Sequence, residues 1–388
     1  MISFQSTLEE PTRGLAGATE APIRETPRRP RTAAPGTAWE FVGSTAAAAA
    51  LVIVLFALAG THPIFGMLVC FFLAFLLIYG ILSYLRHGVL IAKDRLATVC
   101  ITIGALIALF PLLEIIVSVI WNGAPVAFSH FPAFFVHDMS RVGPNDPVWK
   151  GGMGNAIVGT VEQVGLATLY TVPISMLVAT YLSESSTIFS RFVRSVVDVM
   201  MGTPSIIAGL FVYLLWVQPR GTSGYSGFAA SVALAILMLP IMIRTAEEVI
   251  RVVPGSLREA ALAVGSPRWR VSLRIVIPTV RTGLLTAIIL GVALAVGETA
   301  PTLFTTHGNP HYNWNPFSGN QANLPLQAFQ FIELSSDNFV REAWGGAFIL
   351  VSMVLGLFIM ARLVGSFRPG RQRRFRLRRR PTKEAVFP

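Results

Sequence analysis

The sequence predicts an all-α polytopic membrane protein with about eight transmembrane helices. Hydrophobic residues make up 53% of the 388-residue chain and charged residues 13%, and the mean hydropathy is +0.62. Soluble domains carry roughly 25% charged residues, so this chain has about half the usual share. Its apolar residues are gathered in segments close to the roughly 20 residues that a membrane-spanning helix needs.

The chain begins with a polar segment, residues 1–38, that is rich in Pro, Thr and Arg and has no apolar periodicity. It also lacks the hydrophobic stretch of a secretory signal peptide. Such a composition does not support a packed core, so we expect a disordered cytoplasmic tail. Eight apolar spans follow, near residues 40–60, 63–85, 96–121, 154–182, 195–217, 228–246, 279–302 and 344–366.

The basic residues predict how these spans are oriented. Arg86-His87 and Lys93-Asp94-Arg95 form a basic turn between the second and third spans, whereas the long loop at 122–152 is nearly neutral. Short cytoplasmic loops carry an excess of Lys and Arg. Alternation along the chain then puts every longer basic segment on one side of the membrane. We therefore expect both termini to be cytoplasmic.

The first two spans differ from the others because they carry no polar residue suited to line a polar path. The later spans contain several glycines and carboxylates such as Asp198 and Glu298. The sequence thus predicts an N-terminal helix pair at 39–86, followed by a six-span core at 87–366 with a cytoplasmic loop at 255–278.

The C-terminal segment, residues 367–388, is strongly basic. Nine of the 31 Lys and Arg residues lie between Arg368 and Lys383, and the whole chain has a formal net charge of +11. A basic run directly after an apolar helix is typical of a cytoplasmic anchor on anionic lipid. We expect anionic lipid to be the partner of this tail, and we expect no nucleic acid partner.

A polar stretch of the loop, Glu259–Pro278, reads EAALAVGSPRWRVSLRIVIP and lies between two apolar spans. Helix-forming residues run up to Gly265, which can adopt the left-handed conformation that ends a helix. Ser266-Pro267 then offers an N-cap and an N1 proline for a second short helix. The sequence predicts a folded helix–glycine turn–helix on the cytoplasmic face, a suitable docking surface for a partner.

Motifs for catalysis or for cofactor binding are absent from the sequence. It has no G-x-x-x-x-G-K-[ST] loop, no dinucleotide fingerprint, no H-E-x-x-H and no G-x-S-x-G. His307 and His311 lie in a Gly- and Pro-rich loop that does not align them as metal ligands, and Cys70 and Cys100 both fall in apolar spans. We expect a non-catalytic subunit without metal or cofactor, driven by another subunit.

Arg244, together with Glu247 and Glu248, lies at the inner end of the sixth span, just before the cytoplasmic loop. Two interpretations remain open. The charges either reach the lipid headgroups as an interfacial anchor, or they brace the loop against the membrane helices.

Glu298 lies in the sequence Gly297-Glu298-Thr299-Ala300-Pro301. It follows Arg281 by 17 residues, about 25 Å of helix, so we place it toward the outer part of the bilayer. A carboxylate at that depth is usually paired or functional. The alternative is that it reaches external water.

Gly202-Thr203-Pro204-Ser205 interrupts the fifth span. Thr203 is suited to cap a helix that restarts at Pro204, roughly 13 Å into the membrane counted from Arg194. The free N–H groups of such a half-helix attract anions. The competing interpretation is an ordinary proline kink.

The loop resembles the EAA loop of binding-protein-dependent ABC importers, which docks on the ATPase subunit. The matching residues are Glu259, Ala260, Ala261, Gly265, Ile275 and Pro278, while Ile277 stands in place of the family leucine. This resemblance implies that these residues form the ATPase-docking site.

A more specific resemblance is to the PstA family, permeases of bacterial phosphate ABC importers. It rests on residues 151–152, 156–160, 203–209, 239–241, 244–245, 253–254, 258–261, 297–301 and 303–304. It implies a type I ABC importer permease in the bacterial inner membrane. Thr203, Pro204, Ser205, Arg244 and Glu298 would then belong to the substrate path.

The resemblance also implies a set of partners. These are a homologous PstC-like permease, two ATPase subunits and an extracytoplasmic phosphate-binding protein. One position departs from the family: Leu294 occupies the place of an arginine four residues before Glu298. How Glu298 is neutralised is therefore open. The alternatives for the whole chain are an importer of another oxyanion or small solute, and a basic-tailed membrane scaffold or lipid sensor.

Overall fold

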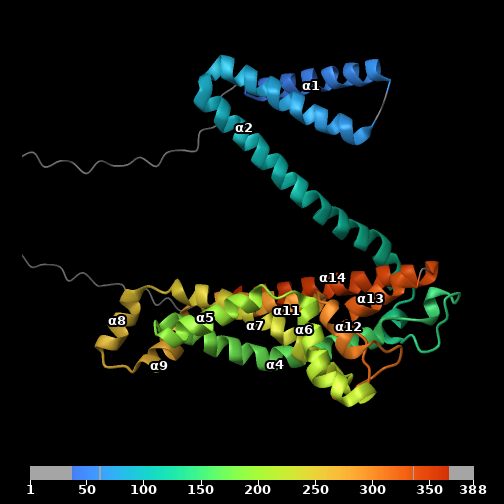
Figure 1. The fold of residues 1–388 in the computed structure, drawn as a ribbon, viewed down its shortest axis with the longest axis vertical. Helices are drawn as coiled ribbons and strands as arrows, with labels where there is room; N and C mark the ends of the chain where they lie inside the picture. Colours follow the sequence, from blue (N-terminus) through green and yellow to red (C-terminus); the bar gives the residue numbers. More distant parts are fainter. Residues whose placement is uncertain (1–36, 61–62, 335, 367–388) are drawn as a thin grey trace, which may run out of the picture. The chain divides into compact units, whose positions relative to one another are not determined.

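The computed structural model describes residues 37–60, 63–334 and 336–366. The chain divides into two compact units, Met1–Pro111 and Leu112–Pro388, and the division falls within the long helix α2 (Ile64–Ser129). Figure 1 follows the chain through its helices. The segment 367–388, for which we predict a lipid anchor, lies outside the described residues, as does nearly all of the predicted N-terminal tail.

The first unit consists of α1 (Thr37–Ala59) and the part of α2 that precedes Leu112. A break at Gly88 (φ 80°, ψ 174°) divides this part of α2 into two helical segments. Its core includes Ala48, Phe75 and Tyr79. The buried carboxylate of Glu40 accepts hydrogen bonds from Arg86 and Arg95, on either side of the break. The helix that follows the basic turn therefore starts inside this unit.

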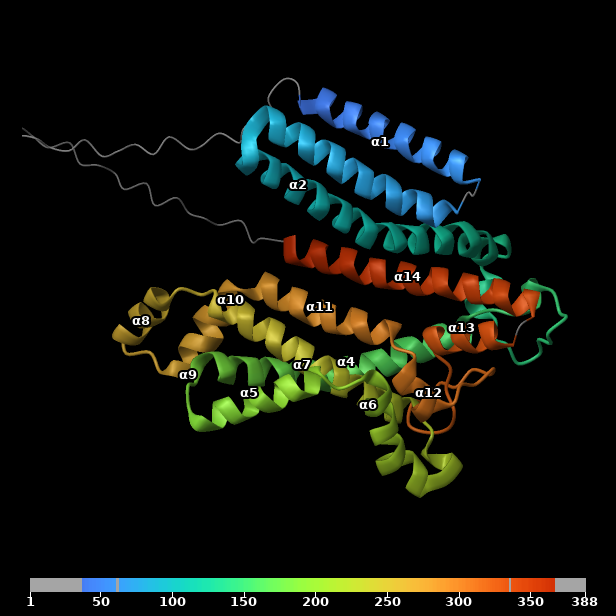
Figure 2. The ribbon, with the colours of Figure 1, turned by 45° about the horizontal axis from the view of Figure 1, so that its top comes forward.

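The second unit is a helix bundle built around α4 (Gly154–Glu184), α7 (Gly227–Arg251) and α11 (Arg281–Gly297), with α14 (Asp337–Ser366) packed beside them. Figure 2 shows these four helices running along one another. Their shared core contains Val164, Leu234, Met238, Met242, Ala295 and Val296. The helix faces that meet are apolar, so ordinary helix packing buries these residues.

Two helix pairs in this unit are sharply bent. α5 (Ile188–Met201) and the helical segment Ser205–Gly224 meet at 102°, and Arg268–Thr279 meets Arg281–Gly297 at 78°. Ser205–Gly224 contains α6 (Ser205–Val212), a π-helical turn (Tyr213–Val217) and a 3₁₀ segment (Gln218–Gly224). Gly209 lets α6 approach α12 (Ala300–Thr306), because a Cβ there would lie 2.5 Å from Pro301 Cα.

The predicted spans have helical counterparts. Among the described residues, five helices are long and apolar enough to cross a membrane, and the two bent pairs raise the number to seven. One of the five, α2, has 66 residues and is broken at Gly88, and its two helical segments cover the predicted spans 63–85 and 96–121. The predicted span 279–302 is shorter than expected, because α11 ends at Gly297 and α12 is a separate helix.

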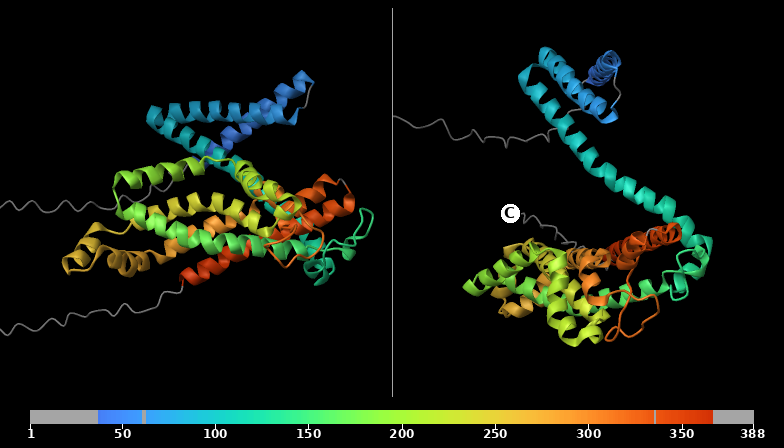
Figure 3. Two further views of the ribbon diagram at one scale, coloured as in Figure 1. Left: turned by 60° about the horizontal axis from the view of Figure 1, so that its bottom comes forward. Right: turned by 45° about the vertical axis from the view of Figure 1, so that its right-hand side comes forward.

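Short elements occupy the two ends of the bundle. α8 (Gly255–Ala263), α9 (Arg268–Val271), a π-helical turn (Ser272–Val276) and α10 (Ile277–Thr279) form one end. The opposite end holds α12, α13 (Leu324–Glu333), α3 (Ala133–Val136) and a 3₁₀ turn (Val148–Lys150). Figures 1 and 2 and the left panel of Figure 3 place α8 and α9 away from α12 and α13. We call these the α8 end and the α13 end.

Candidate functional site

The predicted helix–glycine turn–helix is present at the α8 end. Helix α8 stops at Ala263, and Gly265 adopts the left-handed conformation (φ 82°) while its N–H donates to the Leu262 carbonyl at 2.9 Å. The second helix begins one residue later than expected, at Arg268, with Pro267 in the N-cap position and no side-chain cap from Ser266. Proline fixes φ at either position, so the local sequence does not decide between N-cap and N1.

The six residues matched to the docking loop divide into two groups. Glu259, Ala260, Gly265 and Pro278 are exposed. Ala261 and Ile275 are half-buried and pack against a core that includes Ile250, Val276 and Leu284. The second group therefore holds the segment on the bundle, and the first group is available to a partner.

Exposed apolar side chains surround the exposed residues of the first group. Val264 is 86% exposed and Trp269 59% exposed, and Leu257 and Leu262 are also accessible. These apolar residues are not part of the motif that the loop matches. What pointed to them in the sequence was the presence of large apolar residues in a segment too polar to lie in lipid.

Glu247 is the centre of a buried ion-pair cluster at the same end. Its carboxylate, with a side chain 2% exposed, accepts hydrogen bonds from Arg194 Nη2 (2.8 Å), Arg244 Nη1 (3.1 Å) and Arg251 Nη2 (2.6 Å). Arg194 belongs to α5 and also donates to the Leu182 carbonyl on α4. The cluster therefore fixes α4, α5 and α7 to one another, which favours the brace over the interfacial anchor.

Arg258, next to Glu259 in α8, extends this bracing to the exposed helix–glycine turn–helix. Its Nη1 lies 3.2 Å from Glu184 Oε1 at the end of α4, and its Nη2 donates to the Ile250 carbonyl at 2.9 Å. Two membrane helices are thus connected directly to the first helix of the exposed segment.

The break before α6 is present, but its capping differs from the expectation. Pro204, not Thr203, is in the N-cap position, and no side chain caps the helix. The Thr203 hydroxyl instead donates back to the Val199 carbonyl at 3.3 Å. Threonine near a helix C-terminus readily bonds to the carbonyl four residues earlier, and that competing bond determines the geometry here. The bend of 102° is larger than a proline kink and favours a separate half-helix.

Ser205 and Glu298 are brought together from distant parts of the chain. Ser205 is the first residue of α6, and its side chain lies close to that of Glu298, the residue that ends α11. No described Lys, Arg or His forms an ion pair with Glu298. Leu294 is 37% exposed and supplies no charge. The Ser205 hydroxyl is therefore a polar neighbour of the Glu298 carboxyl group at the start of α6, and Leu294 stands where the family has an arginine.

Arg244 is not part of this arrangement. Its guanidinium contacts Asp198 and Glu247 at the α8 end. Glu298 shares a small pocket with Leu234, which precedes Arg244 by ten residues of α7, about 15 Å of helix. The five predicted path residues thus lie in two places, with Thr203, Pro204, Ser205 and Glu298 around the start of α6 and Arg244 in the brace.

Buried polar side chains that sequence reasoning missed lie beside Glu298. Thr160, Gln163 and Asn323 line the same small pocket, which has no room for a water molecule. Asn323 donates to Gln163 at 2.8 Å, and the Thr160 hydroxyl accepts from the Leu324 N–H at 2.9 Å. Gln163 within the apolar span 154–182 was the available signal. Its partner in the loop before α13 was not predictable locally.

Comparisons with known proteins agree with one another. The family model described as "Binding-protein-dependent transport system inner membrane component" matches residues 171–373. The chain is 36% identical over 268 residues to the phosphate transport system permease protein PstA of Mycobacterium leprae, covering 68% of this chain and 86% of that protein. It is 37% identical over 263 residues to PstA of Haemophilus influenzae, covering 67% of this chain and 89% of that protein.

A MetNI methionine ABC transporter chain in an inward-facing conformation has 17% sequence identity and a TM-score of 0.43, covering 54% of this chain and 91% of that chain. An amino acid ABC transporter crystallised with histidines has 20% identity and a TM-score of 0.43, with the same coverage.

Proposed function

This chain belongs to the binding-protein-dependent transport system inner membrane components, and among them to the PstA permeases of phosphate ABC transport systems, and we propose that it forms half of the phosphate path and docks its ATPase through the segment 255–278. It is a non-catalytic transmembrane subunit. The observation that carries the proposal is the exposed helix–glycine turn–helix, held on the bundle by Arg258 and the Glu247 cluster.

The docking surface consists of Glu259, Ala260, Gly265 and Pro278, to which we add the exposed Val264 and Trp269. Apolar and aromatic side chains surrounded by polar ones are typical of the centre of a protein interface. Arg258 and Glu247 connect this surface to α4, α5 and α7. Movement of an ATPase on the surface is thereby passed to the membrane helices as a rigid displacement.

The phosphate path includes the start of α6. A helix N-terminus offers N–H donors and positive potential to an anion, and Ser205 adds a hydroxyl. Glu298 already places a carboxyl group against Ser205. Phosphate arriving there would have to displace this group, so we propose that Glu298 holds the site closed to anions until the transporter changes conformation.

The complete transporter contains partners that follow from the family. We propose a homologous PstC-like permease, two copies of the ATPase and an extracytoplasmic phosphate-binding protein. Both termini would be cytoplasmic, and the basic segment 367–388 would contact anionic lipid. This orientation puts the α8 end on the cytoplasmic side, where ATP is available.

Uptake of labelled phosphate tests the substrate directly. A strain lacking this subunit should lose high-affinity phosphate uptake and regain it when the gene is restored. Uptake of sulfate and of small neutral solutes serves as the comparison. Restoration of one of these activities without phosphate uptake would replace phosphate by another cargo.

A further inference from the structure

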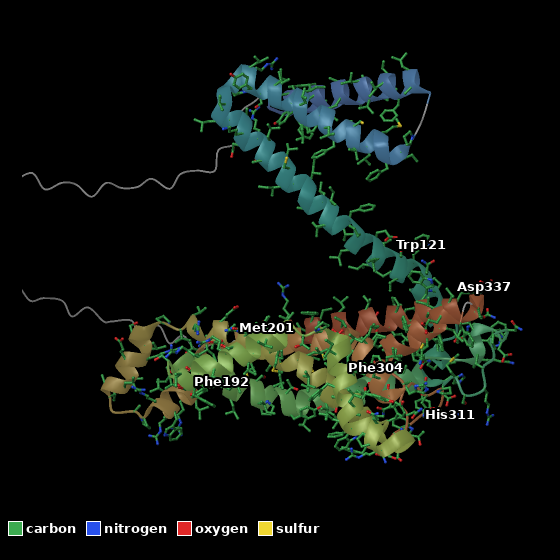
Figure 4. All side chains as sticks on the ribbon, in the orientation of Figure 1. Trp121, Phe192, Met201, Phe304, His311 and Asp337 are labelled. Carbon is green, nitrogen blue, oxygen red and sulfur yellow. The ribbon has the colours of Figure 1, made fainter. Side chains whose placement is uncertain are left out.

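A groove of about 1160 Å³ opens in the second unit, near the α13 end. Its walls are the last turns of α2, the segment around Val148 and the first turns of α14. Figure 4 marks two of its residues, Trp121 on α2 and Asp337 at the start of α14. The groove is separate from the residues assigned above to ATPase docking and to the phosphate path.

The α14 wall carries two opposite charges. Asp337, Arg341 and Trp344 recur at spacings of four and three residues, which puts them on one face of the helix. Asp337 and Arg341 are exposed, and neither forms an ion pair with the other or with any further residue in the described part of the chain. Both charges are therefore available to a ligand.

The facing walls are aromatic. Trp121 is 79% exposed and Trp149 56% exposed, and the ring of His130 lies 5.7 Å from that of Trp149. Indole rings gather at the membrane–water boundary, where one side of the ring is apolar and the N–H is hydrated. Trp121 follows directly on the apolar segment 101–120 of α2, so the groove lies at the depth of the lipid headgroups.

Together, the two opposite charges and the aromatic rings of the groove suit a zwitterionic ligand. Aromatic faces and a carboxylate attract an ammonium group, and a guanidinium binds a phosphate diester. The volume suits a molecule of drug size, much larger than a phosphate ion. We propose that the groove binds a zwitterionic phospholipid, with its phosphate at Arg341 and its ammonium among Trp121, Trp149 and Asp337.

Binding can be measured on the purified transporter complex. Native mass spectrometry after delipidation and titration with phosphatidylethanolamine should show a retained lipid, bound at least about tenfold more tightly than phosphatidylglycerol. Inorganic phosphate in excess should not displace it. Equal binding of the two lipids would overturn the proposal, as would displacement by phosphate, which would make the groove a simple anion site.

Matched variants locate the site. Arg341→Gln and Trp149→Leu should each weaken phosphatidylethanolamine binding about tenfold. Arg141→Gln and Trp314→Leu, at exposed positions outside the groove, should leave it unchanged. Asp337→Asn should remove the preference for the ethanolamine lipid over phosphatidylglycerol. Co-elution with the ATPase reports that each variant is folded. Equal binding by groove and control variants would place the lipid elsewhere.

Discussion

The side chain of Ser205, in the first turn of α6, lies close to that of Glu298, the residue at which α11 ends. The two positions are far apart in the sequence, and Gly209 of α6 approaches Pro301 of α12, three residues after Glu298. Because this contact brings a carboxyl group to the positive end of a half-helix, it is a direct place to test the proposed phosphate path.

An acidic residue at position 205 should block transport. Ser205→Asp would place a second carboxylate against Glu298 and against the anion position. In Ser205→Asn the new side chain is close to aspartate in size but neutral. We expect phosphate uptake to fall at least about tenfold for Ser205→Asp, equivalent to about 1.4 kcal/mol, and much less for Ser205→Asn. Uptake at matched membrane abundance is the measurement. Near-normal transport by Ser205→Asp would rule out an anion site here.

Variants at Thr203 and Pro204 distinguish a half-helix from a simple proline kink. The Thr203 hydroxyl bonds to the Val199 carbonyl and does not cap α6, so Thr203→Val should leave uptake close to normal. If Pro204 serves only as a kink, then Pro204→Ala should be the damaging change while Ser205→Asp is tolerated. The half-helix interpretation expects the reverse order of severity in the same uptake assay.

Gly265 should be intolerant of a β-branched residue. Its φ of 82° costs about 1–2 kcal/mol for most residues, although a Cβ there would meet no neighbouring atom. Gly265→Val should therefore misdirect α9 and weaken co-purification of the ATPase while the permease stays in the membrane. Asparagine tolerates this conformation better, so Gly265→Asn should weaken ATPase binding less. Gly255→Val, at a helical position of the same segment, should leave ATPase binding unchanged. Undiminished ATPase binding by Gly265→Val would refute the docking assignment.

Glu247 should be essential for stability at the α8 end. Glu247→Gln leaves Arg194, Arg244 and Arg251 without their shared buried charge, and breaking a buried pair typically costs about 3–5 kcal/mol. The neighbouring Glu248 is exposed, so Glu248→Gln is the matched control. Thermal unfolding of the detergent-purified complex should show a clear loss for Glu247→Gln alone. Identical melting of the two variants would mean that the cluster does not brace the bundle.

Removal of residues 369–388 should spare phosphate uptake, because the basic tail is proposed to contact lipid and not the path. Uptake by the truncated chain is the first measurement. A topology reporter fused at the C-terminus of the full chain should read cytoplasmic. An external signal would reverse the orientation of the spans and of the docking segment with them.

The sequence by itself determined the class of protein and the form of the docking segment. Hydropathy and basic residues predicted the membrane helices, because lipid demands long apolar segments regardless of how they pack. The turn at Gly265 was equally predictable, since a left-handed turn between two short helices is a local property of glycine.

Only the tertiary structure decided which predicted residues act together. Arg244 and Glu298 both looked like path residues, yet packing placed Arg244 on Glu247 and Asp198, and Glu298 on Ser205. Pro204 also occupies the N-cap position of α6, because the Thr203 hydroxyl donates to the Val199 carbonyl in the preceding helix. The positions of Arg244 and Glu298 depend on which groups meet across helices, and a contact between distant segments leaves no periodic or local signal in the sequence. The cap instead depends on a choice between two local arrangements of Thr203, which the sequence pattern leaves open.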